Sequence, residues 1–511
     1  MKLDRRYLEG GLCKPQIESN EGVVVSKHPL VSEIGHKVLQ DGGNAMDAII
    51  AMAFATGVAE PYMSGLGGIG LGVLYDKNDV HVFTGLPRAP LHLPPELYKV
   101  TSDPKDPLAT AKVDHDANLH GPLAIATPGS LALLWRIWQH GASMPWQDLL
   151  RPSILLAEEG IDVDWNHVLN IAADQRKLSL YPETARIFLP DGFVPSADMN
   201  GTGADRILQS DLADSLQIIG KEGASAFYEG NLGSRFLQHL QQMGGILSQE
   251  DLNTYAAEEV EPGHLQLWGY DIWYAPGFTG GPTLVAMLDG YKEAGISRYP
   301  WGSDKHLQIV ASVSRKAMLE RITGQSQEES TTHLAVIDQN GQAVSLTLTL
   351  LSRFGSRIVV PQTGILCNNG MMWFDPRPDR INSIAPGAIP QVNMSPVLVT
   401  RDHQLVGVLG ASGGRKIMGG LAQVLLNLLL YEMPIDDAIA APRLDVSGRV
   451  MYVDPRLGSS RAEVLSETTE ILFGTKAQFP GVNAYTSPVG IWKTKNGYQA
   501  GVDPFTIASA R

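Results

Sequence analysis

Apolar residues along this chain recur with two spacings, one typical of helices and one typical of strands. Spacings of three and four predict helices at 30–41, 45–58, 129–140, 147–160, 231–243, 282–294, 304–320 and 415–431. Alternation and short apolar runs predict strands at 71–75, 80–84, 266–274, 332–338, 342–350, 396–400, 404–410 and 487–493. Because helices and antiparallel hairpins follow one another, we predict an α+β fold in which helices cover sheets.

The predicted elements form one continuous series. No low-complexity tract, Ser/Gly linker or internal repeat interrupts the 511 residues, which favours a single globule over separate domains. Gly42-Gly43 is expected to end the first helix, and Asn44 is a suitable N-cap for the helix 45–58.

Residues 330–350 are predicted to form a hairpin whose second strand carries a row of hydroxyl groups. Ser345, Thr347 and Thr349 alternate there with apolar residues. A type I turn ending in a left-handed glycine fits the connecting Asp-Gln-Asn-Gly, and it places Thr331 opposite Thr349. A tight turn at 340–341 is the alternative, and it turns Thr349 away from Thr331. Taken alone, the segment is also compatible with an ordinary Thr-rich strand.

A second segment joins the strand 404–410 directly to the helix 415–431 through Gly410-Ala411-Ser412-Gly413-Gly414. The backbone N–H groups at a helix start are unpaired and point the same way. Adjacent glycines let a substrate approach such N–H groups closely, which suits the stabilisation of an oxyanion. An ordinary strand-to-helix turn remains the alternative for this segment considered alone.

Composition narrows the classes of function. With 40 Lys+Arg against 54 Asp+Glu the formal net charge is −14, and no basic run occurs, which excludes a nucleic-acid binder. Two cysteines, Cys13 and Cys367, exclude a disulfide framework. The first twenty residues are polar and no apolar run approaches the roughly 20 residues that span a bilayer. We therefore expect no membrane association and a cytoplasmic location.

Several weaker signals are expected to be structural. The pattern GxGxxG occurs at 65–70, but a helix precedes it and a strand follows, the reverse of a dinucleotide site, so no cofactor is predicted. The 13 histidines show no HExxH and no short paired spacing, so no metal site is predicted. We expect Cys367 to be a core thiol, 371–373 to be lid or core packing, and His333 to have a structural role near the hairpin.

These segments, in this order, resemble the γ-glutamyltransferase family of N-terminal-nucleophile hydrolases. The resemblance includes HPLVSEIGHKVLQDGGNAMDAI, STTHLAVIDQNG and GASGGRK. It is carried by residues 28–70, 126–141, 151–163, 227–255, 330–350, 354–369, 394–399, 410–416 and 441–446. No single block is decisive, but the shared order of all of them is highly specific.

The resemblance implies a four-layer αββα sandwich that is made as an inactive precursor. It implies that the hydroxyl of Thr331 attacks the carbonyl of Ser330, which divides the chain into a large subunit, 1–330, and a small subunit, 331–511. The two fragments would form a heterodimer that can dimerise further. Thr331 would then be an N-terminal nucleophile whose own amine acts as base. Thr349 would hydrogen-bond the nucleophile, and the N–H groups of Gly413 and Gly414 would hold the oxyanion.

The positions that bind a γ-glutamyl donor in the family carry different residues here. An arginine is replaced by Leu86, with Arg88 the nearest arginine, and an asparagine is replaced by Leu351. The remaining replacements are Gly370, Trp373, Val392 and Asn393. A donor ammonium left without its acceptors would be costly to bury, so a standard glutathione hydrolase is not expected.

We therefore expect an amidohydrolase that cleaves a small carboxylate-bearing amide, similar to oxamate, through an acyl-enzyme. The candidate substrate-binding residues are Arg88, Asn369 and Arg415, and Arg353 is a further candidate for the cation that binds the carboxylate. A glutathione hydrolase or γ-glutamyltransferase with a rearranged donor clamp is the alternative. A non-catalytic homologue that acts as a binding protein is the second alternative. The expected partners are a small-molecule amide and the chain's own two fragments.

Overall fold

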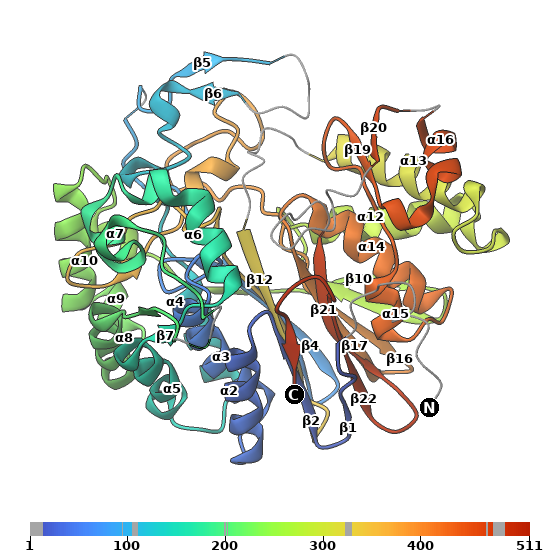
Figure 1. Cartoon of the computed structure of the whole chain (residues 1–511), viewed down its shortest axis with the longest axis horizontal. Coiled ribbons are helices and arrows are strands. Elements are labelled where there is room, and N and C mark those ends of the chain that lie inside the picture. Colours follow the sequence, from blue (N-terminus) through green and yellow to red (C-terminus); the bar gives the residue numbers. More distant parts are fainter. Residues whose placement is uncertain are drawn as a thin grey trace.

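Two seven-stranded sheets lie face to face, and helices cover the outer face of each (Figure 1). The computed structural model describes residues 14–94, 96–104, 111–198, 201, 203–321, 330–466, 469–473 and 486–511. Separate apolar clusters fill the space between each sheet and its helices and the space between the two sheets. The order of layers is therefore α, β, β, α, which confirms the predicted fold. Cys13 lies outside the described residues.

The first sheet contains the predicted hairpin at its centre. Its strand order is β23 (Ser509–Ala510), β2 (Gly22–Ser26), β12 (Ser330–Asp338), β13 (Ala343–Leu351), β3 (Ile69–Asp76), β4 (Asp79–Gly85) and β9 (Glu258–Val260).

The second sheet contains the strand that leads into the glycine-rich turn. Its strand order is β1 (Glu18–Ser19), β22 (Tyr498–Val502), β21 (Ser487–Lys493), β17 (Gln404–Ser412), β16 (Val397–Arg401), β11 (Tyr270–Tyr274) and β10 (Gly263–Leu267).

Short strands outside the two large sheets form four small ones. These pair β5 (Val100–Ser102) with β6 (Lys112–Val113), β7 (Ile161–Asp162) with β8 (Arg206–Ile207), and β14 (Val359–Val360) with β15 (Ile365–Leu366). The fourth contains β18 (Leu444–Asp445), β19 (Met451–Val453) and β20 (Ile471–Phe473).

The helices divide into two groups, one on each side of the paired sheets (Figure 1). Those on the side of the first sheet are α2 (Pro29–Gln40), α3 (Ala45–Ala59), α4 (Ser130–Gly141), α5 (Trp146–Glu159), α6 (Trp165–Leu178), α7 (Pro182–Phe188), α8 (Ser210–Glu222), α9 (Ser225–Tyr228), α10 (Asn231–Gln242) and α11 (Gln249–Asn253). Those on the side of the second sheet are α12 (Gly281–Glu293), α13 (Asp304–Glu320), α14 (Lys416–Leu429), α15 (Ile435–Ala440) and α16 (Ser459–Ser466). Among the described residues, none of the helices is both long and apolar enough to cross a membrane.

Strand alternation explains why the first sheet is buried on both faces. Leu334 and Val336 of β12 pack into the cluster beneath the helices, whereas Ala335 and Ile337 pack into the cluster between the sheets. Successive side chains of a strand point to opposite faces, so a strand covered on both sides must be apolar at nearly every position. The hydroxyl row of β13 faces the second sheet, because Ser345 donates to the carbonyl of Leu409 in β17 at 2.9 Å.

Helix α3 forms the floor beneath the hairpin. Fourteen of its fifteen residues are buried, and a helix that is apolar on all sides belongs in the interior. Asn44 caps it as predicted, and its side chain accepts hydrogen bonds from the backbone N–H groups of Met46 and Asp47. The helix ends at Ala59, so the first residue after it, Glu60, lies at the edge of the core.

The hairpin adopts the first of the two predicted registers along most of its length. His333 pairs with Thr347, and Asp338 and Gly341 close the turn with Gly341 in the left-handed region at φ 80°. The tight-turn alternative is therefore wrong. The register changes at the open end, where Ser330 pairs with Leu351 and Thr332 with Leu348. Thr331 thus lies opposite two residues, 349 and 350, instead of directly opposite Thr349 alone.

One predicted strand is wrong in its boundaries. The segment 266–274 contains two antiparallel strands, β10 and β11, joined by Trp268 and Gly269, which have φ angles of 50° and 82°. Two successive residues with positive φ form the tight turn that matches the twist of a hairpin. Tryptophan is uncommon in this conformation, which is why the sequence does not indicate the turn.

The two sheets lie close together where His333 meets Gly410. A Cβ atom on Gly410 would lie 2.1 Å from the imidazole of His333, so only glycine leaves room for the ring. The imidazole is fully buried, its Nδ1 lies 2.9 Å from the hydroxyl of Thr347, and burial lowers its pKa to about 3. These contacts place His333 in a structural role that fixes β12 against β17.

We expect Gly410→Ala to lower stability by about 1–3 kcal/mol, because the added methyl group overpacks the contact with His333. Gly419→Ala is the matched control: it lies in α14 with no atom within 4 Å of the added Cβ, and it should be neutral or stabilising. The thermal unfolding midpoint measures both. Equal midpoints for the two variants would contradict the contact described here.

Candidate active site

A pocket opens where the ends of β12 and β17 meet helix α6. About 700 Å³ of empty space, part of it open solvent, lies between its walls. Its walls come from segments far apart in the sequence: Lys27, Glu60, Met63, Trp165, Asn166, Asn170, Ser330, Thr331, Arg353, Ser412, Gly413, Ser487, Phe505, Thr506 and Ile507. Of the sequence-predicted residues, Ser330, Thr331, Arg353 and Gly413 are brought together here.

The peptide bond between Ser330 and Thr331 lies at the pocket, and several hydrogen bonds hold it in place. Thr349 donates its hydroxyl hydrogen to the carbonyl oxygen of Ser330, and the backbone N–H of Leu351 donates to the Thr349 oxygen at 2.7 Å. Ser330 itself donates from Oγ to the carbonyl of Tyr62 at 2.9 Å. A donor on a carbonyl oxygen withdraws electron density from the carbonyl carbon, so the bond predicted to be cut is polarised.

The glycine-rich turn approaches the same bond from the second sheet. Gly413 and Gly414 have φ angles of 128° and 57°, which side-chain-bearing residues rarely adopt. Their carbonyl groups accept from the backbone N–H groups of Lys416 and Ile417, which places both glycines at the N-terminal end of α14. Gly413 lines the pocket, whereas Gly414 is not among the described residues that line it.

Lys27 follows strand β2 and brings a buried cation to the pocket. Its ammonium donates to the carbonyl and the hydroxyl of Ser487, with 3.0 Å from Nζ to the carbonyl oxygen. Burial lowers the pKa of Lys27 to about 8, although the carboxylates of Asp503 and Glu60 act in the opposite direction. The lysine therefore keeps its charge in neutral solution and holds β2 to the start of β21.

Glu60 brings a buried acid to the opposite wall. Its Oε2 accepts from the hydroxyl of Thr332 at 3.3 Å, and the residue is 1% exposed. Burial raises the pKa of Glu60 to about 7, and the charges of Lys27 and His167 and the hydrogen bond from Thr332 limit the increase. A carboxyl group beside the predicted nucleophile thus titrates close to neutrality.

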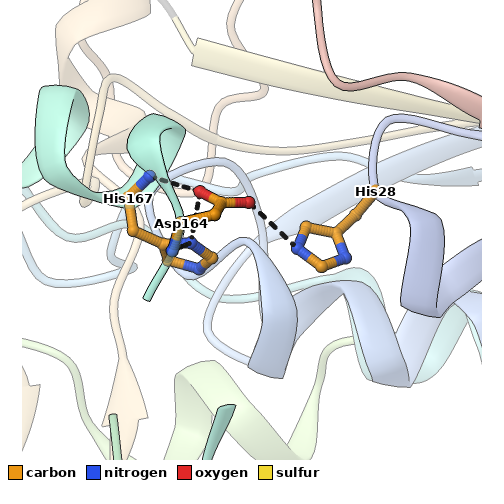
Figure 2. Close-up of side chains that lie close together, drawn as sticks. All are labelled: His28, Asp164 and His167. Carbon is orange, nitrogen blue, oxygen red and sulfur yellow. Dashed lines mark hydrogen bonds and ion pairs between the residues drawn. The ribbon is translucent and has the colours of Figure 1, made fainter. Parts of the chain in front are cut away.

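Behind the pocket, His28, Asp164 and His167 form a compact cluster (Figure 2). Asp164 Oδ1 lies 2.8 Å from Nδ1 of His167, and its Oδ2 lies 3.7 Å from Nε2 of His28. Nε2 of His167 donates to the carbonyl of Ala59 at 2.8 Å, at the C-terminal end of α3. His28 directly follows Lys27, Asp164 directly precedes Trp165, and the carbonyl that accepts from His167 belongs to the residue before Glu60. The cluster therefore joins the three segments that carry these pocket residues.

The ligand atoms of this cluster lie within 4.8 Å of one another, as do those of His81, His140 and Glu259 at the surface. In the first group, the side chains already hydrogen-bond one another and the backbone, and Asp164 also caps α6. The sequence prediction of no metal site stays a prediction.

Arg353 presents a guanidinium to the pocket. Its Nε donates to Asp174 Oδ2 at 2.9 Å, and the other carboxylate oxygen pairs with the buried Arg357 at 3.2 Å. Within the described part of the chain, the two terminal nitrogens of Arg353 have no hydrogen-bond partner, and its side chain is 41% exposed. A fixed guanidinium with two unpaired donors is suited to bind a carboxylate.

The other predicted substrate-binding residues lie elsewhere. Arg88 donates to the carbonyl groups of Asp251 and Thr254 at 2.7 and 3.0 Å, next to α11. Asn369 is buried and donates to the carbonyl of Leu119 and the hydroxyl of Ser352. Arg415 is buried at the start of α14. None of the three is among the described residues that line the pocket.

The positions that correspond to the family's donor-binding residues are packed with apolar side chains. Leu351, Trp373 and Val392 are fully buried in the cluster between the sheets, and Leu86 packs against them. That these side chains fill the space of a glutamyl donor stays a prediction. Met371, Met372 and Cys367 are also fully buried, as expected for core residues.

The sequence prediction missed Lys27, Glu60 and most of the α6 wall. Lys27 ends an apolar run, Gly22–Ser26, and Glu60 ends another, Ala45–Ala59. A single charged residue at the end of a buried element lies at the boundary of the core, and this signal was available in the sequence. The α6 residues carry no comparable signal.

Comparison with known proteins agrees with this geometry. The family model described as gamma-glutamyltranspeptidase matches residues 31–325 and 318–510. The acylase ACY 1 proenzyme of Pseudomonas sp. (strain V22) is 31% identical over 498 residues, which cover 88% of this chain and 87% of that protein. The glutathione hydrolase proenzyme of Bacillus subtilis (strain 168) is 28% identical, and the match covers 84% of this chain and 82% of that protein.

Two solved structures show the same fold. The cephalosporin acylase from Bacillus halodurans superposes with a TM-score of 0.84 at 24% identity, covering 98% of this chain and 97% of its own. The gamma-glutamyltranspeptidase of Helicobacter pylori superposes with a TM-score of 0.54 at 27% identity, and the match covers 59% of this chain and 84% of that chain. The chain therefore belongs to the gamma-glutamyltranspeptidase family of N-terminal-nucleophile hydrolases and is an enzyme of that class.

Proposed function

We propose that this protein is a self-processing threonine amidohydrolase that cleaves an amide whose acyl group carries a carboxylate. The observation that carries the proposal is the arrangement at 330–331, where Thr349 polarises the Ser330 carbonyl beside the hydroxyl-bearing Thr331. Two relatives are named as proenzymes, which is consistent with a chain that matures by cleavage.

In the proposed maturation, Oγ of Thr331 forms a bond to the carbonyl carbon of Ser330 and the bond from that carbon to the Thr331 nitrogen breaks. Water then hydrolyses the resulting ester. The products are residues 1–330, which end in a carboxylate, and residues 331–511, which begin with a free amine. That amine titrates near pH 8 when unperturbed, so it can accept the hydroxyl proton of its own threonine.

In the proposed turnover, the same hydroxyl attacks the substrate carbonyl and its proton passes to the α-amine. The N–H groups of Gly413 and Gly414 stabilise the oxyanion, and preorganised donors of this kind lower such a barrier by several kcal/mol. The C–N bond then breaks, and the proton on the α-amine passes to the departing amine. Water attacks the acyl-enzyme ester and releases the acid. An acceptor amine in place of water would give transfer instead of hydrolysis.

Arg353 supports a carboxylate on the acyl group. Asp174 holds Arg353 on the pocket wall. The terminal nitrogens of Arg353 donate no hydrogen bonds to other described residues. An oxamate-like substrate remains the specific proposal from the sequence.

A γ-glutamyl donor is the second candidate, and the relatives named glutathione hydrolases favour it. The packing of Leu351, Trp373 and Val392 argues against it, because it puts apolar side chains at three of the positions where the family binds the donor's α-amino acid. A location in the cytoplasm and a further dimerisation of the heterodimer stay predictions.

Denaturing electrophoresis and mass spectrometry of the purified protein should show two fragments, 1–330 and 331–511. Thr331→Ala should remain a single chain of 55.2 kDa without turnover, because both maturation and catalysis need the hydroxyl. Thr332→Ala, which removes the neighbouring hydroxyl, should still be cut. Purified protein that is active while intact across the 330/331 bond would overturn the proposal.

Initial rates with oxamate, a glutaryl anilide and a γ-glutamyl anilide distinguish the substrate classes. We expect the γ-glutamyl compound to be the poorest substrate, because apolar Leu351, Trp373 and Val392 stand at positions where the resemblance implies acceptors for its ammonium. A rate with γ-glutamyl anilide above both others would favour the glutathione hydrolase alternative.

Arg353→Gln should raise KM for the best carboxylate-bearing substrate about 10- to 100-fold with a much smaller change in kcat, because a charge-assisted pair to the substrate is lost. The same substrate with its carboxylate esterified should show no such change. Arg186→Gln, at an exposed arginine of α7, is the matched control. Equal KM values for wild type and Arg353→Gln would show that another group binds the carboxylate.

A further inference from the structure

Self-cleavage needs a base other than the one that the mature enzyme uses. Before cleavage, the nitrogen of Thr331 belongs to a peptide bond, and its lone pair is delocalised into the carbonyl group. It therefore cannot accept the proton of the Thr331 hydroxyl. A different base has to activate that hydroxyl in the uncut chain, and it has to lie in the same pocket.

Three charged side chains line the pocket among the described residues: Lys27, Glu60 and Arg353. Arg353 does not lose its proton in proteins. Burial lowers the pKa of Lys27 only to about 8, so the lysine is mostly protonated in neutral solution, and its N–H groups donate to the carbonyl and the hydroxyl of Ser487. His333, two residues along the strand, is fully buried, with Nδ1 2.9 Å from Thr347 and its ring against Gly410, and it is not among the described residues that line the pocket. Glu60 remains.

Glu60 lies where a base for the uncut bond is needed. The residues that follow it hold the bond, since the carbonyl of Tyr62 accepts from Ser330 Oγ at 2.9 Å. Its own carboxyl group accepts from Thr332, the residue after the nucleophile, at 3.3 Å. Glu60 and Thr331 line the same pocket, so the carboxyl group lies on the pocket wall at the end of β12. A buried carboxyl group with a single long hydrogen bond is costly to retain for structure alone.

The surroundings of Glu60 set its proton affinity in a useful range. Burial raises its pKa to about 7, the charges of Lys27 and His167 and the Thr332 hydrogen bond lower it, and Asp164 raises it. These groups come from the segment after β2, from α6 and from β12, the elements packed against it. The cluster in Figure 2 fixes His167, whose Nε2 donates to the carbonyl of Ala59, directly before Glu60. A base with a pKa near the working pH is the most effective proton acceptor.

We propose that Glu60 is the general base of self-cleavage. This inference rests on the proposed function. In the uncut chain the Glu60 carboxylate takes the proton of Thr331 Oγ, directly or through one water, as Oγ bonds to the carbonyl carbon of Ser330. When the C–N bond breaks, the carboxyl group returns that proton to the Thr331 nitrogen. The charge is thus unchanged over the step, and the α-amine that it creates becomes the base for later turnover.

The test follows the conversion of freshly made full-length protein into two fragments. Cell-free synthesis is stopped, the sample is transferred to buffers from pH 5.5 to 9, and denaturing electrophoresis gives the rate of cleavage. For the wild type we expect the rate to rise with pH and level off above about 7, because Glu60 is active only when it has lost its proton.

Glu60→Gln should slow cleavage by about 100-fold or more and remove the rise with pH, because the amide cannot accept a proton at these pH values. Glu33→Gln, at an exposed glutamate of α2, is the matched control and should cleave like the wild type. Glu60→Asp keeps the acid with a shorter reach, so it should cleave slowly and retain the rise with pH. Circular dichroism of each variant checks folding, and Glu60→Asp carries the test if Glu60→Gln does not fold.

Lys27→Met distinguishes the two titratable groups. Loss of the lysine charge raises the pKa of Glu60, so cleavage should persist with its midpoint at a higher pH. If Lys27→Met abolishes cleavage while Glu60→Gln leaves it unchanged, Lys27 is the base and the proposal for Glu60 is wrong. Cleavage of Glu60→Gln at the wild-type rate and pH profile overturns it as well. A wild-type chain that never cleaves, with Glu33→Gln also intact, overturns the proposed function itself.

Discussion

The hydrogen bond from Thr349 to the carbonyl of Ser330 is the interaction around which the site is arranged. It exists because the register of the β12–β13 hairpin changes at its open end, where one residue of β12 lies opposite two residues of β13. Irregularities of this kind bend a strand and redirect a side chain, and they are common next to active sites. Leu351 completes the arrangement: its φ of 84° brings its N–H onto the Thr349 oxygen and fixes the direction of the hydroxyl.

The charges around this bond come from three separate parts of the chain and have separate tasks. Lys27 ties β2 to the second sheet, Glu60 lies at the end of the most buried helix, and Arg353 is held against α6 by Asp174. Each is next to an apolar element that fixes its backbone, so little conformational freedom is lost when a substrate binds. The cluster of His28, Asp164 and His167 connects the same segments from behind, which makes the pocket wall a cooperative unit (Figure 2).

Local patterns in the sequence were sufficient for eight of the helices and for the hairpin that carries Thr331 and Thr349, but they missed α6, α8, β2 and β22. The turn residues 338–341 select the register, and alternation selects the face. The sequence could not indicate the turn at Trp268, because its positive φ comes from the pairing of two strands rather than from residue preference. Arg88 was a reasonable candidate by its place in the chain, but the carbonyl groups near α11 take up its guanidinium. Arg353 becomes the better candidate only when Asp174, far away in sequence, is placed beside it.

The order of strands determines how the two parts of the chain, before and after the 330/331 bond, depend on each other. Strands that precede this point alternate in the sheets with strands that follow it: β2 lies between β23 and β12, and β22 lies between β1 and β21. Neither part could therefore complete a sheet by itself, and each would expose unpaired strand edges if the two were separated. If the chain is cut there, the polypeptide has to assemble before it is divided. The division would then change its connectivity, while the interleaved strands would keep the two products joined without a covalent link.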